Sequence, residues 1–501
     1  MDVLLRKSAL AARPAGVLAV GVPEGVTRFA GAALELDRAT KGALARVIDA
    51  GDFTGRAGDA SLLYPTGVKA KRVLLVGLGP LAKLDEKRIR LAAAQASRRA
   101  RELGAGTLAL ALHSAAALDD ATAQAAAEGA VLGHHRYSAY KSQGAKPALT
   151  RIELLTGAKA ATRGAAAAVE RGATRGRAVC LARDLASTPG QDLTPIQLAA
   201  RAKEVAKLAG AKLTVFDEAA MERLGMGCVL AVGRGSVNPP RFIVLDRAAN
   251  AVPRGRKPHT IVIIGKGVTF DTGGYSLKPR DGMGKMKYDM SGSAAVLGLF
   301  ASLPALGKMP VRVVGLIPSA ENMVSDAAYK PGDVIRAIDG TTIEVTNTDA
   351  EGRLLLADAL GYARRFTPET VIDLATLTGA MAIALGRHAA GLYTRDDLLA
   401  SELLDAGEAT GERLWRMPLW DEFLNEMRSE VADLVNSDEK SEGGSNKAAA
   451  FLEHFAGDMH WAHLDIASTA WTYTERADAS RGPNAFGVRL LTRWLEARAR
   501  R

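Results

Sequence analysis

Four carboxylates lie in three short segments of this chain whose residue types suit the binding of cations. Asp271 closes a glycine-rich stretch, Asp289 follows in Lys-Tyr-Asp-Met, and Asp349 and Glu351 lie together in Asn-Thr-Asp-Ala-Glu-Gly-Arg. Carboxylates brought close together repel one another and raise one another's pKa unless cations neutralise them. Two divalent metal ions about 3.5–4 Å apart would neutralise them, and hydrolases use such a pair to activate water and polarise the scissile group.

No histidine lies in these segments, so oxygen ligands would dominate a metal site there, and Mn, Mg or Zn would fit. Each carboxylate also has a structural interpretation. Thr348 and Glu351 have the spacing of a helix capping box, Asp289 has the position of a cap for a helix beginning near Ser291, and Asp271 suits a glycine-rich turn.

Three basic residues accompany the carboxylates. Lys266 and Lys278 flank Asp271 in the chain, and Arg353 follows Glu351. In the structural interpretation the two lysines are surface cations or partners of the acids, and Arg353 pairs with Asp349. The joint pattern is what favours a functional interpretation.

The elements that position these residues are indicated by apolar periodicity. Helical patterns at Ala294–Leu303 and Leu354–Arg365 separate strand-like runs. The strand-like runs are Phe242–Leu245, Thr260–Ile264, Val311–Ile317, Thr342–Thr346 and Val371–Leu374. This alternation predicts a mostly parallel α/β sheet covered on both faces, with ligands at the carboxyl ends of the strands. We therefore expect the four carboxylates to meet at one end of a single sheet.

A chain of 501 residues exceeds the ~250–300 residues at which single cores stop growing, which predicts two α/β domains. Residues 1–165 form the smaller N-terminal domain in this prediction, with strands at Val73–Val76 and Leu108–Leu110 and a helix at Arg88–Leu103. A helix-forming stretch reaching about residue 180 links it to a catalytic domain over 181–501. Gly77-Leu78-Gly79 lacks the third glycine of a dinucleotide-binding fingerprint.

Composition narrows the classes further. No run of ~18 apolar residues predicts a membrane span, and the N-terminus is typical of an opening strand, not of a signal peptide. Two cysteines, Cys180 and Cys228, favour a reducing cytoplasm over a disulfide framework. The net charge of +10 comes from scattered basic residues, so a solvated basic surface is favoured over a nucleic-acid site.

The motifs closely resemble those of the leucyl aminopeptidase (cytosol aminopeptidase) family, peptidases with two metals. The resemblance is good from about residue 180 to the C-terminus and extends to the N-terminal domain only in layout. The matching segments are Gly265–Asp271 with Gly273-Gly274 and Lys278-Pro279, Met286–Met290, Asn347–Leu354, Arg183–Leu185 with Thr188-Pro189, Asp373–Ala380 and His463–Ala467.

This resemblance implies a role for each site residue. Asp271 and Glu351 would bridge two divalent metals, Mn or Zn, with Lys266 and Asp289 completing one site and Asp349 the other. Lys266 would have to lose its proton to bind metal, which burial beside two dications makes feasible.

The resemblance also implies a mechanism. A metal-bridged hydroxide would attack the peptide carbonyl, and protonated Lys278 would stabilise the resulting oxyanion. Arg353, at a helix N-terminus, would hold a bicarbonate that acts as the general base, and the Leu377 backbone N–H would bind the same anion.

The residues implied to bind the substrate or the anion are Met286, Ala350, Gly352, Thr376, Leu377, Gly379, Ala467 and Ala470. A pocket of methionine, alanine and glycine should favour Leu or Met as the first residue. The free α-amine of a peptide would coordinate a metal, so an acetylated peptide should be refused. The family's homohexamer is expected as the assembly.

Departures from the family pattern fall outside the implied metal ligands. They are Ser291-Gly292-Ser293 in place of a Gly-Gly-Ala series, Ser445-Asn446-Lys447 in place of Thr-Ile-Thr or similar, and Ser468 in place of glycine.

Another two-metal hydrolase such as a phosphoesterase would use the same carboxylates, but the chain has no histidine-bearing metal motif and no Walker loop. A basic DNA-binding role, in addition to peptide cleavage, would show strongly salt-dependent binding.

Overall fold

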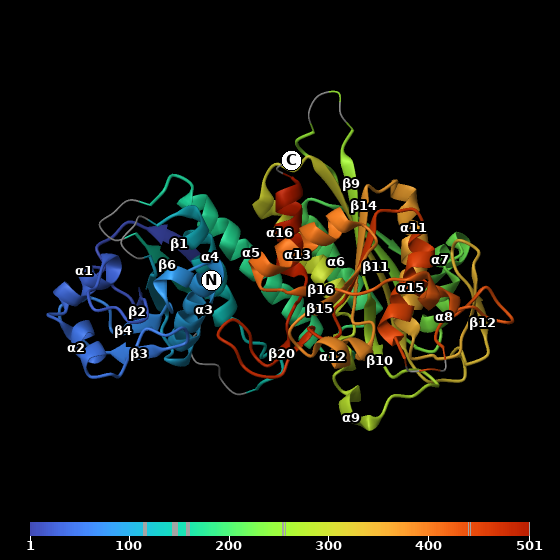
Figure 1. Ribbon diagram of the computed structural model, residues 1–501, viewed down its shortest axis with the longest axis horizontal. Helices are drawn as coiled ribbons and strands as arrows, with labels where there is room; N and C mark the ends of the chain where they lie inside the picture. Colours follow the sequence, from blue (N-terminus) through green and yellow to red (C-terminus); the bar gives the residue numbers. More distant parts are fainter. Residues whose placement is uncertain are drawn as a thin grey trace. The chain divides into compact units, whose positions relative to one another are not determined.

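The computed structural model describes residues 1–113, 118–142, 149–156, 161–252, 255, 257–438, 440 and 442–499. The chain divides into two compact units (Figure 1). The N-terminal unit comprises Met1–Cys180 with Tyr473–Arg481, and the C-terminal unit comprises Leu181–Thr472 with Gly482–Arg501. The prediction of a two-domain α/β protein is confirmed.

The N-terminal unit is built on a six-stranded sheet that is parallel except at β3. The strands, in spatial order, are β1 (Asp2–Arg6), β6 (Arg151–Leu155), β5 (Thr107–Ala111), β2 (Val17–Val22), β4 (Val73–Gly77) and β3 (Ala60–Leu63). Alternate residues of β4 enter two different apolar clusters, because neighbouring side chains of a strand point to opposite faces.

Helices cover both faces of this sheet. The cluster on one face includes α1 (Gly31–Ala39) and α2 (Ala43–Asp49), and the cluster on the other includes α3 (Glu86–Glu102), α4 (Asp120–His134) and the first turns of α5 (Ala165–Ser187).

Several expectations for this unit can be compared with the structure. The predicted opening strand, the strands at β4 and β5 and the helix α3 are confirmed. After Gly77 comes a short 3-10 turn (η1, Leu81–Lys83), and α3 begins only at Glu86, so the direct strand-to-helix junction of a dinucleotide site is not formed. The helix expected between about residues 150 and 180 begins only at Ala165 and ends at Ser187, because β6 occupies Arg151–Leu155; residues 157–160 lie outside the described residues.

The C-terminal unit contains a nine-stranded sheet whose centre is parallel. Its strands, in spatial order, are β16 (Leu414–Arg416), β15 (Ala390–Tyr393), β18 (Trp461–Asp465), β14 (Thr370–Ala375), β9 (His259–Gly265), β11 (Val311–Asn322), β8 (Arg241–Arg247) and β7 (Lys212–Phe216), with β10 (Gly267–Asp271) parallel to the end of β11. Among the described strands, antiparallel pairing is confined to the outer strands β15, β8 and β7. Because the central strands pair in parallel, the prediction of a mostly parallel sheet is confirmed.

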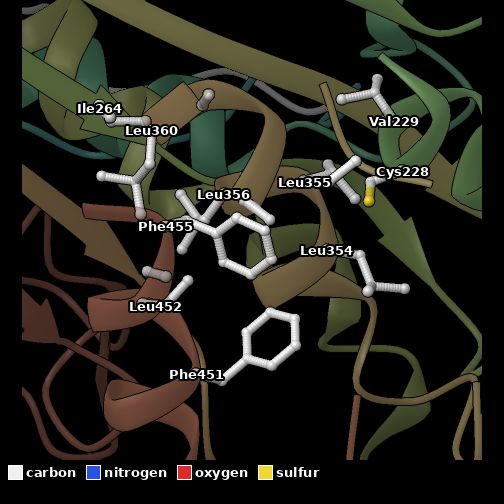
Figure 2. Close-up of a cluster of buried hydrophobic side chains, with 14 of the residues drawn as sticks. Cys228, Val229, Ile264, Leu354, Leu355, Leu356, Leu360, Phe451, Leu452 and Phe455 are labelled. Carbon is white, nitrogen blue, oxygen red and sulfur yellow. The ribbon is translucent and has the colours of Figure 1, made fainter. Parts of the chain in front are cut away.

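One face of this sheet is covered by α8 (Gly227–Gly233), α11 (Glu351–Ala363) and α15 (Gly444–Ala456). Figure 2 shows leucines of α11 interdigitated with Phe451 and Phe455 of α15 and with Ile264 of β9. The other face is covered by α6 (Pro195–Ala209), α10 (Ser291–Ser302) and α16 (Val488–Arg498), with α13 (Asp397–Thr410) packed on α16.

The remaining elements of this unit are short. They are α7 (Glu218–Leu224), α9 (Arg280–Met283), η2 (Met286–Tyr288), η3 (Leu303–Leu306), η4 (Arg364–Phe366), α12 (Gly379–Leu385), α14 (Asp421–Asn425), β19 (Trp471–Thr472) and β20 (Gly482–Pro483). The helical stretch Arg280–Leu306 has the length and composition of a membrane span, but 83% of its apolar window is buried inside the structure, as in a core helix.

The expectation that all four carboxylates reach one end of a single sheet is wrong in one respect. The strand that precedes Asp349, β13 (Thr342–Glu344), lies in a separate sheet between β12 (Val334–Arg336) and β17 (Leu434–Val435). Pairing with β12 needs only a short hairpin, which is available locally, and this pairing was not evident from the apolar pattern of β13 alone.

The core in Figure 2 predicts the cost of a cavity. Leu356→Ala, at a fully buried position of α11, should lower the free energy of unfolding of the C-terminal unit by about 2–5 kcal/mol. All five tryptophans lie in this unit, so urea unfolding followed by tryptophan fluorescence reports on it alone. Leu208→Ala, at an exposed leucine of α6, is the control; equal midpoints for both variants would contradict the packing described here.

Candidate metal centre

The carboxyl ends of the parallel strands bring the predicted residues together. Lys266 follows β9, Asp271 ends β10, Asp289 follows η2 and Glu351 begins α11. Carboxylate oxygens of Asp271, Asp289 and Glu351 all lie within 4.8 Å of one another, and all three side chains are buried. Residues spread over about eighty positions of sequence therefore form one compact acidic cluster.

Lys266 lies in the middle of this cluster. Its Nζ is 2.8 Å from Asp289 Oδ2 and 2.7 Å from Glu351 Oε1, and it donates to the Thr376 carbonyl at 3.0 Å. Burial by itself lowers the pKa of Lys266, as expected, but the charges of Asp289, Glu351 and Asp271 outweigh it and the net shift is upward. The three carboxylates of the cluster therefore favour the protonated form of Lys266.

Lys278 reaches the cluster from the loop after β10. Its Nζ is 2.8 Å from Asp271 Oδ2 and forms an ion pair with Asp349. Burial lowers the pKa of Lys278, but Asp271, Glu351 and Asp349 outweigh it and raise the pKa overall. The lysine side chain is still 19% exposed, so it faces the side of the cluster that solvent reaches.

Asp271 does have the turn-stabilising role considered above, in addition to its place in the cluster. Its Oδ1 accepts from the Gly273 backbone N–H at 2.8 Å and from Asn322 Nδ2 at 2.9 Å. Asn322 also donates to the Thr348 carbonyl at 3.0 Å, so it joins two of the acidic segments. Sequence reasoning missed Asn322; its position at the carboxyl end of a long buried strand was the available signal.

The capping interpretations are not borne out. Helix α11 has Ala350 as its N-cap without a side-chain hydrogen bond, and α10 likewise begins after Met290 without a side-chain cap. Thr348 Oγ1 instead accepts from Ser276 N at 2.7 Å and donates to the Gly273 carbonyl at 2.6 Å. Thr348 therefore joins the two loops that carry Asp271 and Asp349.

Arg353 does not pair with Asp349 among the ion pairs of the described residues. It is buried, its Nη1 donates to the Asn436 carbonyl at 2.8 Å, and its Nε has no hydrogen-bond partner. Burial lowers the pKa of Arg353 to about 10, against the opposing charges of Glu351 and Asp465. A buried guanidinium with an unused donor near a helix N-terminus is suited to an anion.

Two glycines make room for this arrangement. A Cβ on Gly352 would lie 2.8 Å from Lys266 Nζ, so any other residue there would force the lysine side chain to shift away from its place in the cluster. A Cβ on Gly292 would lie 2.1 Å from the Leu374 carbonyl, so glycine lets α10 begin against β14. The second position retains glycine within Ser291-Gly292-Ser293, where the sequence departs from the family pattern.

The electrostatics of the cluster fit a divalent cation. Burial first, and then the neighbouring Asp271, raise the pKa of Glu351 to about 8, and burial raises that of Asp289 to about 6 despite the opposing charge of Lys266. Glu351 Oε2 is buried without a hydrogen-bond partner. A cation bound to these oxygens would remove the repulsion and satisfy the unpaired acceptor.

The residues expected on the substrate side lie around the same edge of the sheet. Thr376 and Leu377 follow β14, Gly379 is exposed at the start of α12, Met286 is half-buried in η2, and Ala467 follows β18. Three others, Ala350, Gly352 and Ala470, are buried.

Thr376 also touches the acidic cluster, because its Oγ1 donates to Asp289 Oδ1 at 2.6 Å. The Leu377 backbone N–H donates to Asp465 Oδ1 at 3.2 Å, so an anion would have to share it. Asp465 also accepts from Thr378 Oγ1 at 2.6 Å and from Ala467 N at 3.1 Å. Asp465 thus holds together the loops after β14 and β18, a role that its motif alone did not reveal.

Comparisons with known proteins agree with this arrangement. The description "Cytosol aminopeptidase family, catalytic domain" matches residues 180–492, and the N-terminal domain of the same family matches residues 19–144. A probable cytosol aminopeptidase of Roseiflexus castenholzii is 47% identical over 456 residues, covering 90% of this chain and 92% of that protein. The Geobacter sulfurreducens relative of the same name is 42% identical over 489 residues, 97% of each chain.

Solved structures of similar fold include two enzymes. The bottromycin maturation enzyme BotP in complex with Mn has a TM-score of 0.84 and 38% identity, covering 97% of this chain and 99% of that chain. A variant of tomato leucine aminopeptidase has a TM-score of 0.86 and 33% identity, covering 99% and 96%.

The acidic cluster predicts that divalent cations stabilise the C-terminal unit. Protein stripped with a chelator should melt at a higher temperature when Mn²⁺ or Zn²⁺ is added, because a ligand of the folded state shifts unfolding by mass action. At a metal concentration a hundredfold above Kd, the free energy of unfolding should rise by about 2.7 kcal/mol. Thermal melting followed by tryptophan fluorescence measures the shift. Glu351→Gln should reduce it, whereas Glu422→Gln, on the exposed start of α14, should keep it; an undiminished shift in Glu351→Gln would place the cation elsewhere.

Proposed function

The chain belongs to the cytosol aminopeptidase family and is a metal-dependent aminopeptidase, and from that premise we propose that it releases N-terminal leucine and other apolar residues from peptides at the acidic cluster around Lys266. The observation that carries the proposal is the meeting of three buried carboxylates within 4.8 Å, with two lysines against them. Asp271, Asp289 and Glu351, with Lys266 and Asp349, would hold two divalent metals.

The two lysines have different tasks in this proposal. Lys266 would give up its proton when the metals bind, because its ammonium and the metal ions compete for the same carboxylates. An amine that binds a metal must also be neutral. Its full burial favours the neutral form once those carboxylate charges are neutralised. Lys278 would keep its proton, because it reaches the cluster from the more exposed side.

When bound, divalent metals would supply Lewis acidity toward the scissile carbonyl and water activated at neutral pH. Mn or Zn is proposed; Mn is supported by the Mn complex of the similar BotP enzyme. The ammonium of Lys278 would stabilise the negative charge that develops on the carbonyl oxygen, an interaction that strengthens in the transition state.

Arg353 is proposed to hold a bicarbonate that acts as the general base. Support comes from its buried Nε, which has no hydrogen-bond partner, and from the adjacent N-terminus of α11. The Leu377 N–H would have to share its hydrogen bond to Asp465 to contribute. Held by Arg353, the anion would supply general-base capacity for the transfer of a proton from water to the leaving amine.

Selectivity for the first residue would come from the small and flexible side chains that border the cluster. Met286 adapts to several shapes, and Gly379 and Ala467 leave room, which suits leucine or methionine. The free α-amine of the substrate would coordinate a metal, which an acetylated nitrogen does poorly. Exopeptidase action is the consequence.

Assembly and surroundings complete the proposal. We propose a homohexamer in the cytoplasm, with the domain division at 165–180. The basic residues behind the net charge of +10 are scattered, which favours a solvated surface over DNA binding.

The test of the function is hydrolysis of Leu-p-nitroanilide by metal-stripped protein after Mn²⁺ or Zn²⁺ is restored. Glu351→Ala should lower kcat/KM by about 10³ or more, since the several kcal/mol of metal stabilisation is lost. N-acetyl-Leu-p-nitroanilide should not be cleaved. An absence of cleavage with any metal, by folded protein, would refute the proposal.

Lys278 and Arg353 can be tested separately. Lys278→Met should lower kcat by about 10²–10³ with a smaller change in KM, because the lost interaction belongs to the transition state. Lys207→Met, on the exposed face of α6, is its control.

Bicarbonate added to dialysed enzyme should raise kcat of the wild type and leave that of Arg353→Ala unchanged; equal stimulation of both would remove Arg353 from the anion site.

A further inference from the structure

The short turn η2 (Met286–Tyr288) sets the backbone position of Asp289. The Asp289 N–H donates to the Met286 carbonyl at 3.2 Å, so the turn continues directly into the carboxylate. The segment before it offers little rigidity, because residues 279–285 are exposed or half-buried and α9 is interrupted by non-helical angles at Asp281 and Gly282. The position of η2 therefore depends on its own contacts.

One of those contacts comes from Lys287. Its Nζ donates to the carbonyl oxygen of Ser187 at 2.9 Å. Ser187 is the last residue of α5, the helix that begins in the N-terminal unit and ends in the C-terminal unit. The C-terminus of a helix carries unpaired carbonyls and the negative end of the helix dipole, so an ammonium is a favourable partner there.

A second contact steadies the same turn. The ring of Tyr288 packs against Trp471 with a centroid distance of 5.3 Å. The side chain of Asp289 is held separately, by Lys266 Nζ and by Thr376 Oγ1, from the edge of the sheet. The sheet thus orients the carboxylate, while α5 and Trp471 position the turn from which it projects.

We infer that Lys287 is a positioning residue of the metal centre, whose hydrogen bond to the last turn of α5 places Asp289 for a metal and Met286 for the substrate. The inference rests on the proposed function for the identity of the metal site and of the Met286 pocket. Lys287 itself contacts no metal or substrate in this assignment.

The expected loss of metal affinity without the Lys287 hydrogen bond follows from preorganisation of the site. A ligand on an unanchored turn samples other positions, so binding a metal must first restrict it. Partners that orient metal ligands typically account for about 10–100-fold in metal affinity or activity. Removing the Lys287 hydrogen bond should therefore weaken metal binding without destroying the site.

The experiment compares Lys287→Met, which keeps length but removes charge and donor, with Lys287→Arg, which keeps both. Lys308→Met, at an exposed lysine of the same unit, is the matched control. Isothermal titration of metal-stripped protein with Mn²⁺ should give a Kd about tenfold weaker for Lys287→Met, close to wild type for Lys287→Arg, and unchanged for Lys308→Met.

Kinetics provide an independent readout. In Lys287→Met the Mn²⁺ concentration for half-maximal activity should rise by about the same factor, and KM for Leu-p-nitroanilide should rise while kcat at saturating Mn²⁺ changes little. Wild-type Mn²⁺ affinity in a folded Lys287→Met variant would overturn the inference. So would equally weak binding by Lys287→Arg, because the hydrogen bond would then not be the cause.

The Mn²⁺ titration separates this inference from the proposed function. If the wild type binds Mn²⁺ but cleaves no aminoacyl substrate, the function fails while the comparison of Mn²⁺ affinities still decides the role of Lys287. Circular dichroism melting confirms that each variant is folded. Should Lys287→Met be unstable, Lys287→Leu, which also removes the charge and the donor, is titrated in its place. Wild-type Mn²⁺ affinity of that folded variant would equally overturn the inference.

Discussion

Three carboxylates with oxygens within 4.8 Å of one another, all withdrawn from solvent, impose the constraint that the rest of the C-terminal unit satisfies. Ionised groups so placed lose hydration and repel one another, and positive charge has to be brought to them. Lys266 and Lys278 supply it in this structure, each against two carboxylates. A site that needs cations this strongly is predisposed to bind divalent metals, because they bring more charge to the same oxygens.

The scaffold keeps these charges together by holding each one from several elements. The parallel strands β9, β10, β11, β14 and β18 end at one edge of the sheet. Three of them end in a residue whose side chain is hydrogen-bonded to another loop or strand: Asp271, Asn322 and Asp465. Asn322 and Thr348 join the loop after β10 to the loop before α11, and Asp465 joins the loops after β14 and β18. Because each bond links different segments, displacement of one loop is opposed by the others.

Close backbone approach is the second requirement. Glycines at 292 and 352 let two helices begin against a strand and against Lys266, where a Cβ would clash. The N-terminal ends of α10 and α11 thereby reach the acidic cluster. The turn η2, which carries Asp289, is held from two sides, by the Lys287 hydrogen bond to Ser187 and by the packing of Tyr288 on Trp471.

The amino-acid sequence by itself determined the class of fold and the chemistry of the site. Apolar runs located β4, β5, β8, β9, β11 and β14 because buried strands and helices have their own periods, and the metal-binding character lies in local motifs such as Asn347–Arg353.

Tertiary structure decided what depends on contacts between distant segments. It placed β13 in a separate sheet, gave Thr348 a loop-joining role in place of a helix cap, and revealed Asn322 and Asp465 as partners of the site. It also set the charge of Lys266, since the balance between burial and three neighbouring carboxylates exists only once the chain has folded.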